Sequence, residues 1–222
     1  MIRWAGMEIL DTFDELIDPK HTALLLWDFT QGGMANAFNA DAVTENTRKL
    51  LSAARRRRVL TLFARQSSMR WEDAGPAMVR LRMKQLRLKN LAAYRRAYRK
   101  RAATGRWLRG LAPGERDIVF EKSLPNAFIG TNFESWLLKH SIRTILVAGV
   151  AAETGIDGTA RTAVDRGYYA VIVKDCVGSP FADTYEAAFT SLERIFDVYD
   201  SAQIIETWRK RTEKSRSSAA KR

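Results

Sequence analysis

The chain has 222 residues, 46% of them hydrophobic, with one cysteine, two histidines and a formal net charge of +12. This length supports one well-cored domain, and the cysteine and histidine counts exclude an internal disulfide, a cysteine-rich zinc site and a histidine-based metal cluster, so we expect no metal and no cofactor. No apolar run approaches the about 20 residues of a membrane helix and the N-terminus lacks an apolar signal segment, so we expect a cytoplasmic protein without membrane contact.

Short apolar runs alternate along the chain with patterns of helical period. This alternation predicts an α/β fold of three α/β/α layers with a mostly parallel, Rossmann-like central sheet. The expected strands are Ala23–Asp28, Val59–Ala64, Asp117–Phe120, Thr144–Gly149, Tyr169–Lys174 and, as a possible sixth, Asp197–Tyr199. The expected helices are Asn39–Arg57, Asn132–His140, Ile156–Arg166, Asp183–Phe196 and Ile204–Arg211.

A basic segment between Gly75 and Gly110 interrupts this alternation. Residues 79–109 carry twelve basic side chains and no acid, which equals the whole net charge. The segment also has an apolar stripe of Leu81, Leu88, Leu91 and Tyr98, and structureless loops of this length are uncommon. We therefore expect one domain over residues 1–208, with a basic helical insertion at about 75–110 lying over the carboxyl ends of the strands, and a disordered basic tail over 209–222.

Three candidate functional positions follow expected strands. Asp28 ends the first strand after five apolar residues, Lys122 follows the third, and Gly155 lies in the turn between the fourth strand and its helix. A carboxylate beside an apolar strand is costly unless it is paired or functional, although Asp28 could instead cap its loop. Backbone N–H groups where a helix begins can bind an anion, whereas a glycine there could serve only the bend.

Four segments together resemble the isochorismatase-like family, also called cysteine hydrolases. They are ALLLWDF, VFEKSLPNAFIGTNFESWL, RTILVAGVAAETGIDGTARTAVDRGY and VIVKDCVGS. The resemblance runs from about Thr22 to about Ile205 and is interrupted only by the basic insertion. It implies a hydrolase active site built on Asp28 and Lys122.

The resemblance also identifies a departure from the family pattern. Most members use an Asp–Lys–Cys triad, and the cysteine falls at Gly155, which has no nucleophile. Isochorismatases proper lack this cysteine and hydrolyse a vinyl ether, so Asp28 is expected to act as general acid and Lys122 to bind a substrate carboxylate or steady Asp28. Burial would then have to keep Asp28 protonated beside the ammonium group. Cys176 follows a different strand and is expected to be a packing residue.

Further residues are expected to bind the substrate. Gln66 resembles a family glutamine, and Arg70 and Trp71 could hold a carboxylate, although they could equally belong to a solvated loop. Ala151 and Ala152 are small where many isochorismatases carry a bulky residue, which implies a different or larger substrate.

Three functions remain open at this point. The first is a nucleophile-free hydrolase of a small, anionic molecule, with isochorismate as the first guess, and the second is a catalytically silent member that binds a ligand or partner. The third, nucleic-acid binding through the basic segment, with Tyr94, Tyr98 and Trp107 as stacking groups, is the least favoured because no recognised motif accompanies the charge. The family also implies a homo-oligomer, in which acids near the N-terminus could face the insertion.

Overall fold

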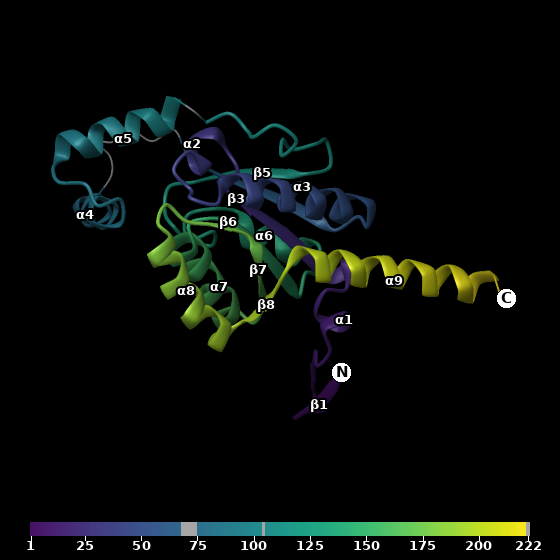
Figure 1. Ribbon diagram of the computed structural model, residues 1–222. Coiled ribbons are helices and arrows are strands. Elements are labelled where there is room, and N and C mark those ends of the chain that lie inside the picture. Colours follow the sequence, from purple (N-terminus) through teal and green to yellow (C-terminus); the bar gives the residue numbers. More distant parts are fainter. Residues whose placement is uncertain (68–74, 104, 221–222) are drawn as a thin grey trace.

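The computed structural model describes residues 1–67, 75–103 and 105–220. Its centre is a six-stranded sheet in the order β5-β4-β3-β6-β7-β8, in which every pair is parallel (Figure 1). These strands are β3 (Thr22–Trp27), β4 (Leu60–Gln66), β5 (Ile118–Lys122), β6 (Thr144–Val150), β7 (Tyr169–Gly178) and β8 (Asp197–Tyr199). The predicted α/β class and all six predicted strands are confirmed.

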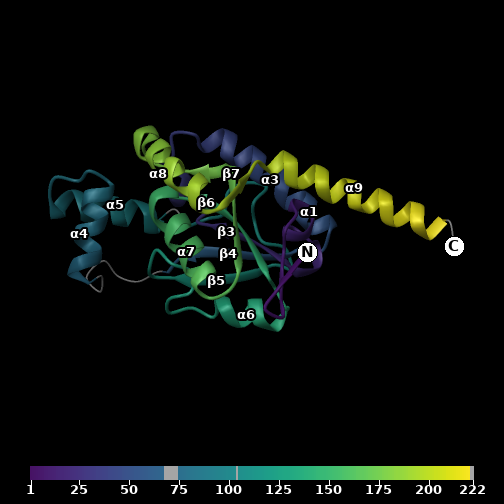
Figure 2. The ribbon, with the colours of Figure 1, turned by 90° about the horizontal axis from the view of Figure 1, so that it is seen from below.

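Helices cover both faces of the sheet (Figure 2). The larger helices are α3 (Ala40–Arg56), α6 (Phe133–Lys139), α7 (Asp157–Asp165), α8 (Ala182–Ile195) and α9 (Ser201–Ala220). On one face α3 and α9 enclose an apolar cluster, and on the other α6, α7 and α8 enclose a second. The five predicted helices are therefore present, with ends that differ by a few residues except at the C-terminus.

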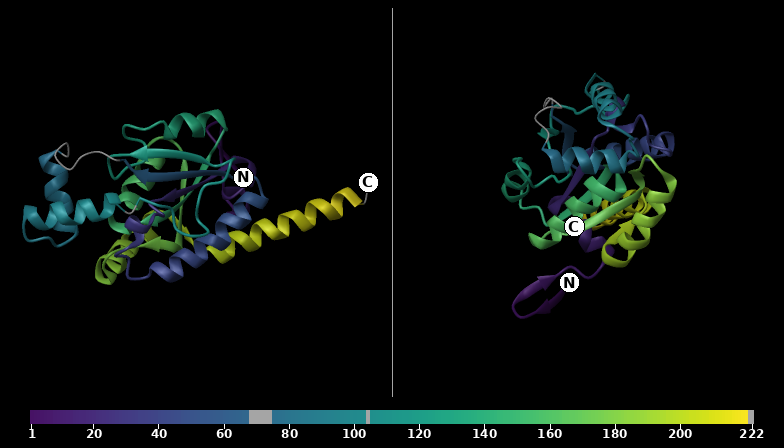
Figure 3. Two further views of the ribbon diagram at one scale, coloured as in Figure 1. Left: turned by 90° about the horizontal axis from the view of Figure 1, so that it is seen from above. Right: turned by 90° about the vertical axis from the view of Figure 1, so that its left-hand side faces the viewer.

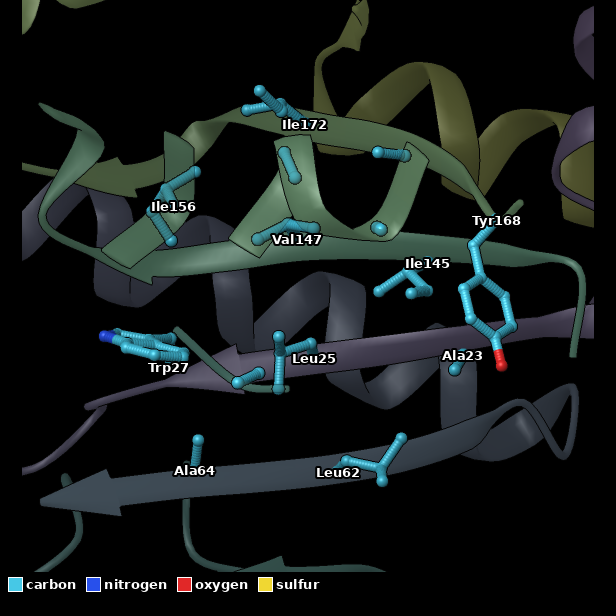
Figure 4. Packing of buried hydrophobic residues seen from close by; sticks show 14 of the residues in the cluster. Ala23, Leu25, Trp27, Leu62, Ala64, Ile145, Val147, Ile156, Tyr168 and Ile172 are labelled. Carbon is cyan, nitrogen blue, oxygen red and sulfur yellow. The ribbon is translucent and has the colours of Figure 1, made fainter. Parts of the chain in front are cut away.

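The central strands are covered on both faces, which explains why their apolar runs are continuous. Leu25 of β3 and Val147 of β6 point into the cluster beneath α6, α7 and α8 (Figure 4), while Leu24 and Leu146 point into the cluster on the opposite face. Side chains alternate along a strand, so a strand covered on both faces needs apolar residues at every position. This burial fixes where β3 ends and thus where Asp28 lies.

The basic insertion forms two helices, α4 (Pro76–Gln85) and α5 (Leu91–Ala103), as expected. They project from the end of the molecule opposite to α9 (Figures 1 and 3). Arg87 between them joins them to the body through an ion pair of 2.6 Å with Asp183 and a contact with the Phe181 ring. The predicted apolar stripe is only partly covered, because Leu81 and Leu91 remain 43% and 57% exposed.

The prediction of a disordered tail at 209–222 is wrong up to Ala220, because α9 is helical over Ser201–Ala220. Trp208 is buried and donates from Nε1 to the carbonyl oxygen of Ile17 at 2.7 Å, which anchors the helix. Beyond it, Arg209 pairs with Glu206 and Glu213 one turn away on either side, and such pairs extend an exposed helix.

The N-terminal region contains short elements that were not predicted. A hairpin of β1 (Ile2–Trp4) and β2 (Met7–Ile9) precedes α1 (Phe13–Leu16), the 3₁₀ turn η1 (Pro19–His21) and, after β3, α2 (Gln31–Met34). Asp14 and Asp18 pair with Arg211 of the same chain, so these acids have an intramolecular role besides the intersubunit one we expected. No helix in the described ranges has the length and apolar character needed to cross a membrane.

Candidate active site

Asp28 and Lys122 form a buried ion pair at the carboxyl ends of β3 and β5. Lys122 Nζ lies 2.9 Å from Asp28 Oδ2, and the two residues are 3% and 2% exposed. The strand order explains this meeting, because β3 and β5 flank β4 and all three end at the same edge. The sequence-based expectation that these two residues share one site is supported by their direct contact.

The loop after β3 requires glycine to hold Asp28 in place. Asp28 has a left-handed backbone with φ of 58°, and its carbonyl oxygen accepts the Thr30 N–H at 2.7 Å. A Cβ on Gly33 would clash with that same carbonyl oxygen. The lack of a side chain at Gly33 therefore lets the chain turn tightly over Asp28.

The turn after β6 is a single π-helical turn, η3 (Ala152–Ile156), that precedes α7. It begins after a cis peptide bond between Val150 and Ala151. The N–H groups of Thr154 and Ile156 both donate to the Ala151 carbonyl oxygen. Those two amides are thus already used inside the turn and do not serve as the anion-binding donors that we expected from this loop.

Trp27 fills the space beside Gly155. A Cβ built on Gly155 would lie 2.6 Å from Nε1 and 2.7 Å from Cε2 of the Trp27 indole. The indole also contacts Lys122, whose Nζ is 3.9 Å from the ring centroid. Position 155, where the family resemblance would place a nucleophile, is therefore closed to any side chain unless the indole moves.

A cavity of about 320 Å³ opens in front of the ion pair. Its inner wall is formed by Trp27, Asp28, Lys122, Ala151 and Gly155. Its outer wall comes largely from the insertion, through residues that include Arg82, Gln85, Leu86, Tyr94, Tyr98 and Lys100. The insertion thus lies over the carboxyl ends of the strands, as predicted, and completes the cavity.

The expected substrate-binding residues divide into three groups. Gln66 and Ala151 line the cavity. Ala152 does not, because it is fully buried in the cluster beneath α6, α7 and α8, where the π-helical turn directs its side chain. Arg70 and Trp71 lie outside the described residues.

Polar contacts tie the insertion to the inner wall. Arg82 Nη2 donates to Gln66 Oε1 at 3.2 Å, and Gln85 Nε2 donates to Thr154 Oγ1 at 3.2 Å. Gln85 also reaches Glu153, which accepts a hydrogen bond of 3.0 Å from the Ser179 hydroxyl. Thr154 and Ser179, the two hydroxyls near the turn, are therefore held in hydrogen bonds.

The cysteine has no catalytic geometry. Cys176 lies in the cluster beneath α3 and α9, fully buried, and burial raises the pKa of its thiol well above the ordinary range. It does not line the cavity. Among the described residues, no group of three or more histidine, cysteine, aspartate and glutamate side chains is arranged to hold a metal ion.

The sequence analysis missed the contribution of Trp27 and of the aromatic residues in the insertion. Trp27 directly precedes Asp28 but reads as a core residue, and its contact with Gly155 joins β3 to the turn after β6, two segments that are far apart in the sequence. Tyr94, considered above as a stacking group for nucleic acid, is 1% exposed and lines the cavity. Trp107, the third residue of that set, packs edge-on against Phe63 at 5.4 Å. These positions remove the two aromatic residues from an exposed nucleic-acid surface.

Known proteins resemble this chain in sequence. An uncharacterized isochorismatase family protein, YddQ, from Bacillus subtilis (strain 168) is 33% identical over 63 residues, which span 28% of this chain and 35% of that protein. The ureidoacrylate amidohydrolase RutB from Pantoea ananatis is 25% identical over 196 residues, which span 80% of this chain and 78% of that protein. The chain thus covers about a third of the first relative and most of the second.

Solved structures show the same fold. A cysteine hydrolase from Pseudomonas syringae pv. phaseolicola 1448A superposes with a TM-score of 0.70 at 20% sequence identity and covers 88% of this chain and 95% of that chain. The model of the isochorismatase domain matches residues 22–203, which include Asp28, Gln66, Lys122 and Gly155. The chain therefore belongs to the isochorismatase family of hydrolases.

Proposed function

We propose that this chain hydrolyses a small, anionic molecule in the cavity without forming a covalent intermediate. The observation that carries the proposal is the buried Asp28–Lys122 pair facing a wall in which Trp27 occupies the space beside Gly155. An acid and an ammonium group are present, whereas a thiol is absent from the described residues that line the cavity. Hydrolysis of a vinyl ether such as isochorismate fits these groups.

In the proposed reaction, Asp28 donates a proton to the terminal carbon of the enol ether. Water then adds to the resulting oxocarbenium carbon and loses a proton that returns to the Asp28 carboxylate. The hemiketal collapses to a ketone and an alcohol, which for isochorismate are pyruvate and a dihydroxylated ring acid. The reaction requires the Asp28 carboxyl group to carry a proton when the substrate is bound; burial favours that uncharged form, whereas the adjacent Lys122 ammonium group favours the carboxylate.

A covalent amide hydrolysis is less consistent with the cavity. The ureidoacrylate amidohydrolase is named for cleavage of a carbon–nitrogen bond. A thiol route of the family type would need a nucleophile at Gly155, where the Trp27 indole leaves no room, and Cys176 is buried elsewhere. We therefore place the chain with the cysteine-free members.

The test measures the release of pyruvate from isochorismate in an assay coupled to lactate dehydrogenase. We expect turnover by the wild type and a loss of at least about 100-fold for Asp28→Asn, the size of a general acid contribution. Lys174→Met is the matched control, because it removes an exposed lysine paired with Glu193 away from the cavity. Absence of pyruvate, or equal rates for Asp28→Asn and the wild type, would refute the proposal.

A second candidate is a catalytically silent member that binds a ligand, and the closed nucleophile position also supports it. The two candidates differ in what happens to the bound molecule. Recovery of isochorismate unchanged after saturable binding would favour the silent member, whereas release of pyruvate would favour the hydrolase.

A further inference from the structure

Two polar atoms in the wall of the cavity have no hydrogen-bond partner among the residues that the structure describes. They are Nε2 of Gln66 and the hydroxyl oxygen of Tyr94, and both are buried. Both residues line the cavity, and they come from different elements: Gln66 ends β4, and Tyr94 belongs to α5 of the insertion. A buried polar group without a partner is costly in a native protein and calls for an explanation such as a ligand.

The orientation of the Gln66 amide follows from its neighbour. Arg82 Nη2 lies 3.2 Å from Gln66 Oε1. A guanidinium group can only donate hydrogen bonds, so the oxygen of the amide must face it and the nitrogen must lie on the other side. Gln66 therefore offers an N–H donor as its unsatisfied group.

Tyr94 lies in α5, the helix of the insertion that contributes to the cavity wall. The residue is 1% exposed, and α5 packs against α2 in the loop that follows Asp28. Its ring lies 6.0 Å from that of Tyr98, one turn further along the helix. An ordered phenol that lacks an internal partner can donate to an acceptor in the cavity.

We propose that Gln66 and Tyr94 form a subsite for a carboxylate group of the ligand. A carboxylate only accepts hydrogen bonds and has two oxygens, so it satisfies an N–H and an O–H donor together. The subsite rests on the proposed function in its choice of cavity. It assigns recognition of the carboxylate to the end of β4 and to the insertion, while Asp28 and Lys122 carry out the reaction.

The test is calorimetric titration of the full chain with benzoate and with its neutral analogue benzamide. We expect benzoate to bind at least about tenfold more tightly than benzamide, and Tyr94→Phe to weaken benzoate about tenfold, the effect of one hydrogen bond to a charged group. The matched control is Tyr199→Phe, a tyrosine of β8 that does not line the cavity, and it should bind benzoate like the wild type.

A second measurement separates recognition from folding. Since the Tyr94 hydroxyl has no partner within the described part of the chain, Tyr94→Phe should keep or raise the melting temperature while it weakens benzoate. Unchanged benzoate affinity in Tyr94→Phe, equal loss in Tyr199→Phe, equal affinity for benzamide, or no binding of benzoate to the wild type would each overturn the subsite. None of these readouts depends on turnover, so failure of the hydrolase proposal is seen separately.

Discussion

The indole ring of Trp27 stands where a side chain at position 155 would have to lie. Its Nε1, Cε2 and Cζ2 atoms would be 2.6, 2.7 and 2.9 Å from a Cβ on Gly155. Such approaches are too short for ordinary carbon contacts, so the glycine and the tryptophan depend on each other. Because of this contact, the site differs from one built around a nucleophilic thiol at position 155.

Gly155→Cys should destabilise the protein by about 1–3 kcal/mol, the usual cost of forcing extra atoms into a packed region. Urea denaturation followed by circular dichroism measures this change. Gly114→Ala is the control, since the nearest atom to its new Cβ would be 3.5 Å away. In a double-mutant cycle, Trp27→Leu should relieve part of the cost of Gly155→Cys, and strict additivity of the two changes would contradict the contact.

Removal of one member of the Asp28–Lys122 pair should be costly. We expect Lys122→Met to lower the free energy of unfolding by about 3–5 kcal/mol, because it leaves a carboxylate buried without its counter-ion. Lys174→Met breaks an exposed pair and should cost no more than about 1 kcal/mol. The double variant Asp28→Asn with Lys122→Met should be more stable than the sum of the single losses predicts; additive losses would argue against a coupled pair.

Cys176 should resist thiol reagents in the folded protein. Burial raises the pKa of its thiol, so the reactive thiolate is scarce at neutral pH. We expect no reaction with Ellman's reagent in native buffer at pH 8 and one thiol per chain after denaturation in guanidinium chloride. Rapid native labelling, comparable to that of a free thiol, would be inconsistent with the fully buried position.

The end of the folded unit should lie within α9 beyond Trp208. Trp208→Ala should cost about 3–5 kcal/mol, since the indole is buried and bonded to the Ile17 carbonyl. Deletion of residues 214–222 removes none of these contacts and should leave the melting temperature within about two degrees of the wild type. A large loss on deletion would show that the last turns of α9 contribute to the core.

The central sheet and the reacting pair were accessible to sequence reasoning because both have strong local signals. Buried parallel strands such as Thr144–Val150 read as unbroken apolar runs, and Asp28 and Lys122 follow such runs directly. The role of Trp27 was not accessible, since an apolar residue in a strand carries no sign of which distant glycine it touches. The cavity-facing position of Tyr94 was hidden for a similar reason, because the charge of its neighbours suggested an outward face.

The C-terminal tail was expected to be disordered, but it is helical up to Ala220. The run from Arg209 onward has few apolar residues, which is typical of disorder. Its charges, however, are spaced for pairing along a helix, as in the Arg209–Glu213 contact, and Trp208 supplies the anchor. Composition alone did not distinguish these two outcomes.

The position of Trp27 also gives the protein an internal optical reporter. Its indole forms part of the cavity wall and lies 3.9 Å from the Lys122 ammonium nitrogen, so its excited state is sensitive to the charge and solvation in front of it. A molecule that displaces water from that wall will change the intensity or wavelength of the emission from this one of six tryptophans. Occupancy can thus be followed without a label, and a Trp27→Phe variant identifies the part of the signal that arises at the site.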